Sequence, residues 1–329
     1  MSAPATWRFV HVNDHHLGTR RSYRYRPAMT ARWEAIKRQM IALGPELLLV
    51  GGDLTRDGDT HEFEYQNARE DLDGLPFPSF VIPGNMDVGN KHTDREGPGA
   101  DRSDIALNMT SARLSRFASW FGPIQWSFLH REVRFTGFYA AVAGSGLREE
   151  ERFWRFMSRL PELPPARHHV AMMHYWPWID APDEPNWDIT QREEYHPWYF
   201  GLDQPHRGRL LDALQAAGVT VLLCGHVHTG RPAERVGAMR VYETPAAGNT
   251  AQMTTRWPDV ETRQGCQLCE VGAEEITVRF IPADDQSPET GGWGPGGHPR
   301  LSERDYSLAQ ELPPLAPDPW LTDETESER

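Results

Sequence analysis

Cysteine is scarce in this chain of 329 residues, which contains only Cys224, Cys266 and Cys269. A count this low and odd argues against a disulfide framework and fits a reducing compartment, so we expect a cytoplasmic location. Cys266 and Cys269 form a single C-x-x-C pair, and a zinc site would need two further ligands nearby. We therefore interpret them as half-buried thiols in a β-strand.

Long apolar runs are also missing. None approaches the roughly 18 residues that a membrane-spanning helix requires, and the longest, within residues 41–50 and 219–224, are interrupted or short. Residues 1–10 have neither an apolar core nor a basic region, so no secretory signal is expected. The sequence therefore predicts no membrane partner.

Basic residues are outnumbered. Lysine and arginine total 34 against 47 aspartates and glutamates, which gives a formal net charge of −13. An acidic chain of this kind is a poor candidate for binding long nucleic acid or anionic membranes, because both need a basic surface. The charge does not exclude a locally positive cleft, since bound cations can be the largest charges in a site.

The first ninety residues alternate between strand and helix patterns. Apolar or β-branched strands are predicted at residues 7–13, 46–50 and 80–82, and helical spacing occupies residues 30–43 and 61–72. A β-α-β-α-β order indicates an α/β fold with parallel strands.

The remainder divides into less regular segments. Further strands are predicted within 125–143 and at 169–173, 219–224, 241–243, 266–271 and 275–281, with helices at 149–160 and 207–217.

We interpret residues 1–283 as one domain with an aromatic-rich insertion at about 176–204, which has no clear period. Residues 284–329 are rich in glycine and proline and then acidic, which is typical of a wrapping or disordered tail.

Polar side chains follow five of the buried strands. In chain order they are Asp14 and His16, Asp53 after Gly52, Asn85 and Asp87 after Gly84, His174, and His226 and His228 after Gly225. Ligand sites in open α/β sheets form beyond the carboxyl ends of strands. Carboxylates, amides and imidazoles suit zinc, manganese or iron. Each signal is weak alone, but their occurrence together at strand ends favours a metal site.

This ordered series of D-x-H, G-D, G-N-x-D, H and G-H-x-H blocks resembles the calcineurin-like metallophosphoesterase superfamily. The resemblance covers about residues 14–228. It implies a four-layer α/β/β/α sandwich of two mixed sheets. Within the superfamily, the set of blocks in a chain of this length is similar to the bacterial cyclic-nucleotide and glycerophosphodiester phosphodiesterases.

The resemblance also implies a dinuclear metal centre. One divalent or trivalent ion (manganese, iron or zinc) would be held by Asp14, His16 and His228. The second would be held by Asn85, His174 and His226, with Asp53 bridging both. Two cations about 3.5–4 Å apart clamp a phosphoryl group, and water or hydroxide between them serves as the nucleophile for in-line attack.

The chain departs from the family pattern at Met86, where the G-N-H-D block usually has histidine. A thioether has no proton to donate, although Asp87 remains. The substrate would then have a leaving group that needs little protonation, or another imidazole would substitute, with His15 and His92 nearest in sequence. The third explanation is a slow or non-catalytic relative.

Substrate contacts are expected near the blocks. Arg20 lies in an arginine-rich loop with Arg21, Arg24 and Arg26, which would hold phosphate or form a solvated loop. Tyr175 and Trp176 follow a predicted ligand, and His196 lies in the insertion. The tyrosine and tryptophan rings would stack on a nucleobase or enclose an apolar ester, or form a hydrophobic plug or a contact between copies in a homo-oligomer, and His196 would line the cleft.

The sequence therefore predicts a phosphohydrolase with two metal ions that acts on a small phosphate ester, with a phosphodiesterase preferred. A phosphomonoesterase, a protein phosphatase or a nuclease of the same superfamily remains an alternative. Outside the enzyme class, the alternative is a metal-binding interaction protein, which Met86 favours.

Overall fold

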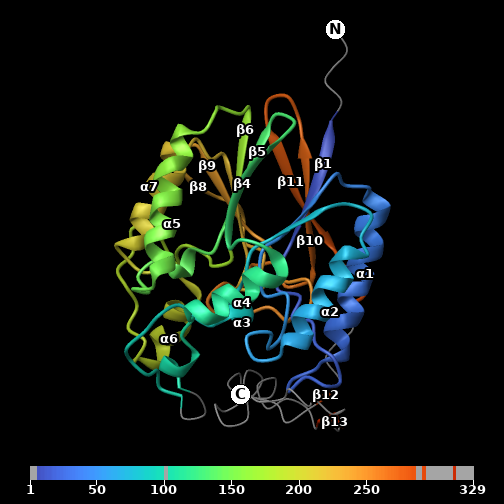
Figure 1. The fold of residues 1–329 in the computed structure, drawn as a ribbon, viewed down its shortest axis with the longest axis vertical. Coiled ribbons are helices and arrows are strands. Elements are labelled where there is room, and N and C mark those ends of the chain that lie inside the picture. The colour runs from blue at the N-terminus through green and yellow to red at the C-terminus, as the bar shows by residue number, and fades with distance from the viewer. Residues whose placement is uncertain (1–5, 100–102, 287–290, 294–313, 316–329) are drawn as a thin grey trace.

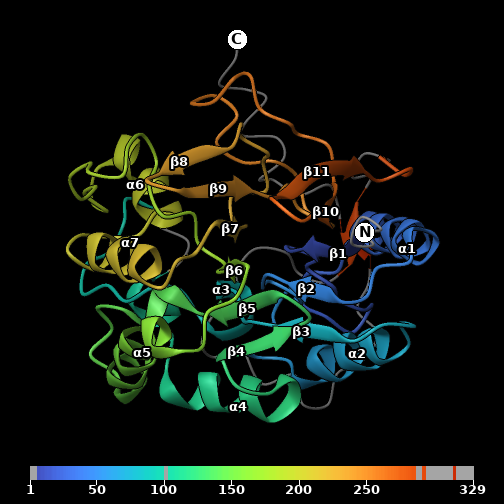
Figure 2. The same ribbon diagram turned by 90° about the horizontal axis from the view of Figure 1, so that it is seen from above.

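Strands of mostly apolar residues form two mixed sheets that pack face to face, with helices on both outer sides (Figure 1). The computed structural model describes residues 6–99, 103–286, 291–293 and 314–315. The predicted four-layer α/β/β/α sandwich is confirmed. Figure 2 shows α1 and α2 outside the first sheet and α5 and α7 outside the second.

The first sheet has the order β11-β10-β1-β2-β3. Its strands are Ile276–Pro282, Gly265–Val271, Trp7–Val12, Leu48–Val50 and Ser79–Val81. β1, β2 and β3 run parallel, as right-handed β-α-β crossovers require. β10 pairs antiparallel with β1, and β11 pairs antiparallel with β10.

The second sheet has the order β4-β5-β6-β7-β9-β8. These strands are Gln125–His130, Val133–Phe138, His168–Met172, Val221–Cys224, Met239–Glu243 and Glu234–Val236. The four central strands are parallel, and the two edge strands pair antiparallel. The short strands β12 (Gly292–Trp293) and β13 (Pro314–Leu315) pair with each other.

Helices connect the parallel strands and cover the sheets. They are α1 (Pro27–Leu43), α2 (Glu62–Asp73), α3 (Asn85–Val88), α4 (Ser111–Phe121), α5 (Arg148–Arg159), α6 (Arg192–Phe200) and α7 (His206–Ala216), with 3₁₀ turns at Ile105–Leu107, Ala140–Val142 and Leu160–Glu162. Among the described residues no helix combines the length and apolar character needed to cross a membrane.

Alternate side chains of the inner strands fill two different cores. Phe9 of β1 faces the second sheet, where its ring meets Phe135 edge-on with 5.0 Å between centroids. Its neighbour Val10 instead packs in the core that includes Trp33 and Ile36 of α1. Strands buried on both faces read as continuous apolar runs. This explains why the sequence shows runs rather than alternation at β2 and β7.

Three expectations differ from the structure in detail. The insertion contains helix α6, whose period is obscured because its nine residues include Pro197 and mix aromatic with charged side chains. Cys266 and Cys269 are free thiols, as predicted, but both are fully buried in β10 because that strand lies between two cores. Most of the predicted tail, residues 284–329, lies outside the described residues.

Candidate metal centre

The predicted donor residues follow strands of both sheets. Asp14, His16, Asp53 and Asn85 come after β1, β2 and β3 of the first sheet, whereas His174, His226 and His228 come after β6 and β7 of the second. These strands end at the same end of the molecule, the lower end of Figure 1 where α3 and α6 lie. The structure brings all seven side chains together at this end, and each is at most 6% exposed.

The backbone at these loops is unusual. Asp14, His16, Asp53, His226 and His228 all have left-handed φ angles, between 50° and 76°. Such conformations cost a non-glycine residue on the order of 1–3 kcal/mol each and persist only where the surroundings impose them. All five lie just after three strands, β1, β2 and β7, which indicates that the packing around the donor side chains imposes these backbone conformations.

The first cluster contains Asp14, His16, Asp53 and His228. His228 Nε2 lies 3.2 Å from Asp14 Oδ1 and 3.3 Å from His16 Nε2. His16 Nε2 is 3.8 Å from Asp14 Oδ1 and 3.7 Å from Asp53 Oδ2. Four donor atoms therefore surround one small volume.

The second cluster contains Asp53, His174 and His226, with Asn85 beside them. His174 Nε2 lies 3.4 Å from Asp53 Oδ1 and 3.2 Å from Asn85 Oδ1. The two carboxylate oxygens of Asp53 thus approach imidazoles of different clusters, which is the geometry that a bridging ligand requires.

Backbone carbonyls orient three of the imidazoles. His174 Nδ1 donates to Gly51 O at 2.9 Å, and His228 Nδ1 donates to Thr250 O at 2.8 Å. His226 Nε2 donates to Tyr199 O at 3.1 Å. A carbonyl can only accept, so each of these nitrogens carries the proton and the other ring nitrogen is left for the cluster. This arrangement is typical of metal-ligating histidines.

Asp14 is held in the same way. Its Oδ2 accepts hydrogen bonds from Asn13 Nδ2 at 2.6 Å and from His226 N at 2.9 Å. Its Oδ1 is buried, has no hydrogen-bond partner, and faces His228 Nε2. Because His228 carries its proton on Nδ1, two acceptors face each other at 3.2 Å. A shared cation removes this unfavourable contact, so the residues present fit a metal ion.

The pKa values of the cluster show the same excess of negative charge. Burial alone would lower the pKa of His174, but the carboxylates of Asp53 and Asp14 raise it to about 9. Burial opposes ionisation of Asp14, yet the histidines His228, His174 and His16 hold the pKa of its carboxyl below the ordinary range. In the metal-free protein a proton on His174 thus partly neutralises the carboxylates. Metal binding at Nε2 would release that proton.

A glycine keeps room for the carboxylate of Asp53. A Cβ at Gly84 would lie 2.1 Å from Asp53 Oδ1 and 2.3 Å from Asp53 N, so we expect Gly84→Ala to displace this carboxylate. Its φ of −109° suits any residue, and the effect is therefore steric. We expect metal affinity to fall at least 10-fold, as for the loss of groups that orient ligands. Isothermal titration of the metal-depleted protein measures it.

Gly74→Ala is the matched control. Gly74 follows α2 with a φ of −75°, and its Cβ would meet nothing closer than Asp71 O at 3.4 Å. This variant should retain the metal affinity of the unmodified protein. Unchanged metal binding by Gly84→Ala would contradict the bridging position of Asp53.

The three residues considered for acid catalysis occupy different places. Asp87 accepts hydrogen bonds from Gly84 N at 2.9 Å and Thr55 N at 3.0 Å, so its carboxylate ties the loop after β2 to the start of α3. Burial and the nearby Asp53 raise its pKa to about 7. His15 is buried edge-on against Trp33 of α1, at 4.2 Å between ring centroids. Its pKa is lowered to about 4, mainly by burial.

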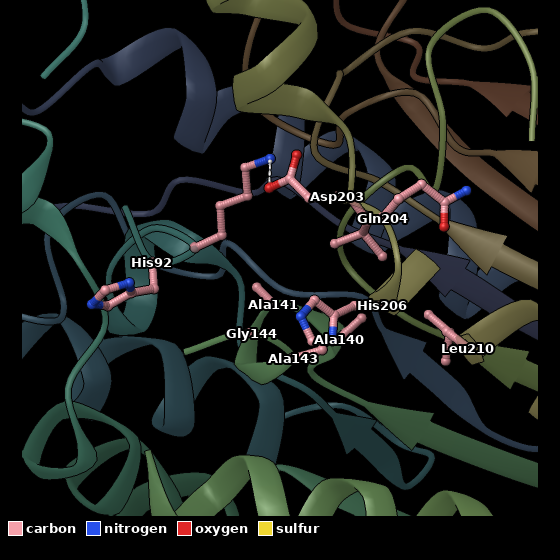
Figure 3. A pocket seen from close by; sticks show the side chains of 11 residues that line it. His92, Ala140, Ala141, Ala143, Gly144, Asp203, Gln204, His206 and Leu210 are labelled. Atoms are coloured by element: carbon pink, nitrogen blue, oxygen red, sulfur yellow. Dashed lines mark hydrogen bonds and ion pairs between the residues drawn. The ribbon is translucent and has the colours of Figure 1, made fainter. Parts of the chain in front are cut away.

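His92 is exposed and lies at a cavity separate from the ligand clusters. Besides His92, its polar lining comes from Lys91, Asp203, Gln204 and His206, over a floor that includes Ala140 and Leu210 (Figure 3). Its volume is about 190 Å³. His92 thus lies seven residues after Asn85 along the chain, but on the side of the molecule where α7 begins.

The residues considered for substrate binding are dispersed. Tyr175 is buried with its ring 4.2 Å from that of His226. Trp176 is fully buried, 5.4 Å from the ring of Trp178. His196 is exposed on α6, where its ring contacts Tyr195 and Phe200.

The arginine loop is only partly solvated. Arg20 is exposed in the turn after β1. Arg24 is buried and donates from Nε to Asp57 Oδ2 at 3.0 Å, because burial of a guanidinium requires a carboxylate partner. Arg24 therefore fastens this loop to the one after β2.

The sequence did not predict some of the hydrogen bonds that hold these donor residues. Asn90 Oδ1 and Tyr199 Oη both accept hydrogen bonds from Asn85 Nδ2, at 3.0 and 2.8 Å. Asn13 holds Asp14, and the carbonyl of Thr250 holds His228. Tyr199 is one of several aromatic residues in the insertion, and its spacing alone does not distinguish it. The carbonyl partners carry no sequence signal because every residue has one.

Comparison with known proteins agrees with this geometry. The profile of the calcineurin-like phosphoesterase family matches residues 8–230, more than half of the chain. The cluster of carboxylates and imidazoles at the strand ends of a four-layer sandwich defines the class of metal-dependent phosphoesterases. The chain belongs to the calcineurin-like phosphoesterase family. No curated protein matches it in sequence.

Solved structures share the fold. The purple acid phosphatase PPD1 from yellow lupin (Lupinus luteus) seeds is 12% identical, with a TM-score of 0.59 over 86% of this chain and 52% of that one. This chain therefore spans about half the length of the lupin protein. GAP50, described as the anchor in the inner membrane complex of Plasmodium, is 13% identical, with a TM-score of 0.52 over 94% and 96% of the two chains. At these identities the likeness shows the fold alone.

Proposed function

We propose that this protein is a phosphodiesterase that uses two metal ions. The observation that carries the proposal is the position of Asp53, whose Oδ1 and Oδ2 approach His174 and His16 of separate clusters. We assign Asp14, His16 and His228 to one ion and Asn85, His174 and His226 to the other. Manganese, iron and zinc all suit these oxygen and nitrogen donors.

Two ions held by these residues would supply Lewis-acid polarisation of a phosphoryl group and a water molecule of lowered pKa as the nucleophile. Other residues of the chain hold the predicted ligands in position. Carbonyls of Gly51, Thr250 and Tyr199 fix the imidazoles. Asp14 is fixed by Asn13, and the backbone N–H of Met86 donates to Asp53 Oδ1 at 2.8 Å. Preorganised groups of this kind need not rearrange as charge develops on the phosphoryl oxygens.

The preference for diesters rests on Met86 and on the aromatic insertion. Met86 is half-buried beside Asn85, whose Nδ2 lies 3.6 Å from Met86 Sδ, and it has no proton to give a leaving group. An ester with a good leaving group needs little protonation. The half-buried rings of Tyr195 and Tyr199 on α6 stack at 6.2 Å between centroids, next to Asn85. Aromatic rings at this place suit a second, aromatic ester group.

Hydrolysis of two chromogenic substrates tests the proposal. We expect manganese-loaded protein to cleave bis(p-nitrophenyl) phosphate with a kcat/KM at least about tenfold above that for p-nitrophenyl phosphate, a difference of about 1.4 kcal/mol in transition-state binding. The Asp53→Asn variant, prepared in the same way, is the control for hydrolysis that does not depend on this site. Faster cleavage of the monoester would overturn the diester preference and indicate a phosphomonoesterase of the same family.

A metal-binding interaction protein is the second candidate function. The replacement of the usual histidine by Met86 favours it, and the fold also occurs in GAP50, which is described as an anchor. Two tightly bound metal ions without turnover of mono-, di- or triesters would support this function. Such a result would contradict the phosphodiesterase.

A further inference from the structure

The insertion places one residue, Tyr199, against two of the donors assigned to the second metal ion. Tyr199 lies near the end of α6, and its hydroxyl accepts a hydrogen bond from Asn85 Nδ2 at 2.8 Å. Its backbone carbonyl accepts a hydrogen bond from His226 Nε2 at 3.1 Å, and its ring lies 5.1 Å from the His226 ring. Asn85 and His226 come from different sheets and are 141 positions apart in the chain. A single residue thus connects them, through its side-chain hydroxyl and its backbone carbonyl.

The contact with Asn85 decides which end of its amide faces the cluster. An amide can present either its oxygen, which binds cations, or its NH₂, which repels them. Asn90 Oδ1 at 3.0 Å and Tyr199 Oη at 2.8 Å both accept from Nδ2. The oxygen is therefore left toward His174 Nε2, at 3.2 Å. Rotation of the amide would bring Oδ1 against Asn90 Oδ1, which is also an acceptor, and would remove the hydrogen bond that Nδ2 donates to Tyr199 Oη.

The contact with His226 decides which ring nitrogen is available. Because Nε2 donates to the Tyr199 carbonyl, Nδ1 is the nitrogen that faces the cluster. The ring is held between Tyr199 and Tyr175, whose centroids lie 5.1 and 4.2 Å away. Tyr175 is fully buried.

The insertion is itself anchored to the Asn85 loop. The buried Lys91 donates from Nζ to Gly201 O at 2.9 Å and pairs with Asp203 at 2.9 Å. Its ammonium group also lies 4.7 Å from the Trp198 ring centroid. Its backbone N–H donates to Tyr175 Oη at 3.1 Å. Lys91 thus holds the end of α6 to the segment that follows Asn85, and Tyr199 is carried on a fixed support.

We propose that Tyr199 is a positioning residue for the second metal ion. Its hydroxyl fixes the amide of Asn85, and its carbonyl fixes the ring of His226. The insertion would then control retention of one metal ion without contributing a ligand. This inference rests on the dinuclear centre proposed above. It assigns a function to the insertion, which lies outside the sequence blocks that supply the predicted ligands.

Removal of the hydroxyl alone tests the proposal. Tyr199→Phe keeps the ring and the carbonyl but leaves Asn85 Nδ2 with one acceptor fewer. We expect titration of metal-depleted protein with Mn²⁺ to show an unchanged first equivalent and a second equivalent weakened about 10- to 100-fold, the usual effect of losing a group that orients a ligand. We also expect the spectrum of magnetically coupled manganese pairs to give way to that of isolated ions, and saturating Mn²⁺ to restore kcat.

Tyr195→Phe is the matched control. Tyr195 lies one turn earlier on α6, and its hydroxyl donates to Asp104 Oδ1 at 2.7 Å rather than to a predicted ligand. This variant should bind both equivalents as the unmodified protein does. Asn90→Ala removes the other acceptor of the Asn85 amide and should weaken the same second equivalent. Thermal melting of each metal-free variant verifies that it is folded.

The outcomes separate this inference from the proposed function. Two equivalents bound by Tyr199→Phe with unmodified affinity would overturn the positioning role while leaving the dinuclear centre intact. Equal weakening by Tyr195→Phe would also overturn it, because the cause would then be the packing of α6. Fewer than two equivalents in the unmodified protein would instead overturn the dinuclear centre itself.

Discussion

The Asp53→Asn variant is expected to lose at least one metal ion and nearly all phosphoesterase activity. Asparagine has the same shape and can still accept the hydrogen bond from Met86 N through its oxygen. It cannot supply two anionic oxygens to two clusters, so the repulsion between two cations is no longer offset. We expect kcat/KM to fall by more than the 10- to 100-fold that follows loss of a merely orienting group. Metal analysis after dialysis and assays with bis(p-nitrophenyl) phosphate measure both effects.

Asp73→Asn makes the same chemical change far from the cluster. Asp73 is an exposed residue of α2 that pairs with Arg69, so its replacement should change neither metal content nor turnover. The same substitution at Asp53 should also lower the pKa of His174, because it removes the carboxylate that most raises that pKa. If Asp53→Asn retained two ions and full activity, the assignment of Asp53 as the bridging ligand would be wrong.

The Met86→His variant is expected to gain activity on esters with poor leaving groups. Met86 is half-buried at the start of α3, its backbone N–H lies 2.8 Å from Asp53 Oδ1, and its sulfur is near Asn85. An imidazole at this position could donate a proton to a departing alkoxide. General acid catalysis is typically worth 10²–10⁴-fold, so we expect about a 100-fold rise in kcat on an alkyl diester. Cleavage of p-nitrophenyl esters should change little, because that leaving group departs without protonation.

Met86→Gln is the control for this substitution, because glutamine is polar and of similar length but is not a general acid. It should leave both classes of substrate unchanged. A gain by Met86→Gln equal to that of Met86→His would show that polarity rather than proton donation matters. No gain by Met86→His on any ester, with two metal ions bound, would favour the metal-binding interaction protein.

The architecture was largely predictable because its signals are local. Buried parallel strands appear as short apolar runs, and the helices between them show their own period. The prediction was incomplete at α6, where Pro197 and a mixture of aromatic and charged residues hide the helical pattern. It was also incomplete for Cys266 and Cys269, because burial on both faces of β10 depends on the layers packed against that strand.

The candidate site was less predictable from the sequence than the fold was. Asp14, Asp53 and His174 could be selected because each follows a strand, and parallel strands deliver their carboxyl ends to one place. The position of a strand end does not predict where the side chains of His15 and Trp176 pack. His15 adjoins two donors in sequence, yet its ring packs on Trp33 of α1, because one step along an irregular loop redirects a side chain. Trp176 follows His174 by two residues and lies in the core.

The sequence by itself determined the fold class, the family blocks and the set of donor residues, because each is written in contiguous segments of a few residues. Only the tertiary structure decided that Asp53 faces two clusters, that His226 offers Nδ1, and that Tyr199 holds Asn85. Those features depend on left-handed backbone angles in the loops and on hydrogen bonds between residues of different sheets. Local sequence patterns carry no information about such distances, since they are fixed when the two sheets and the insertion pack together.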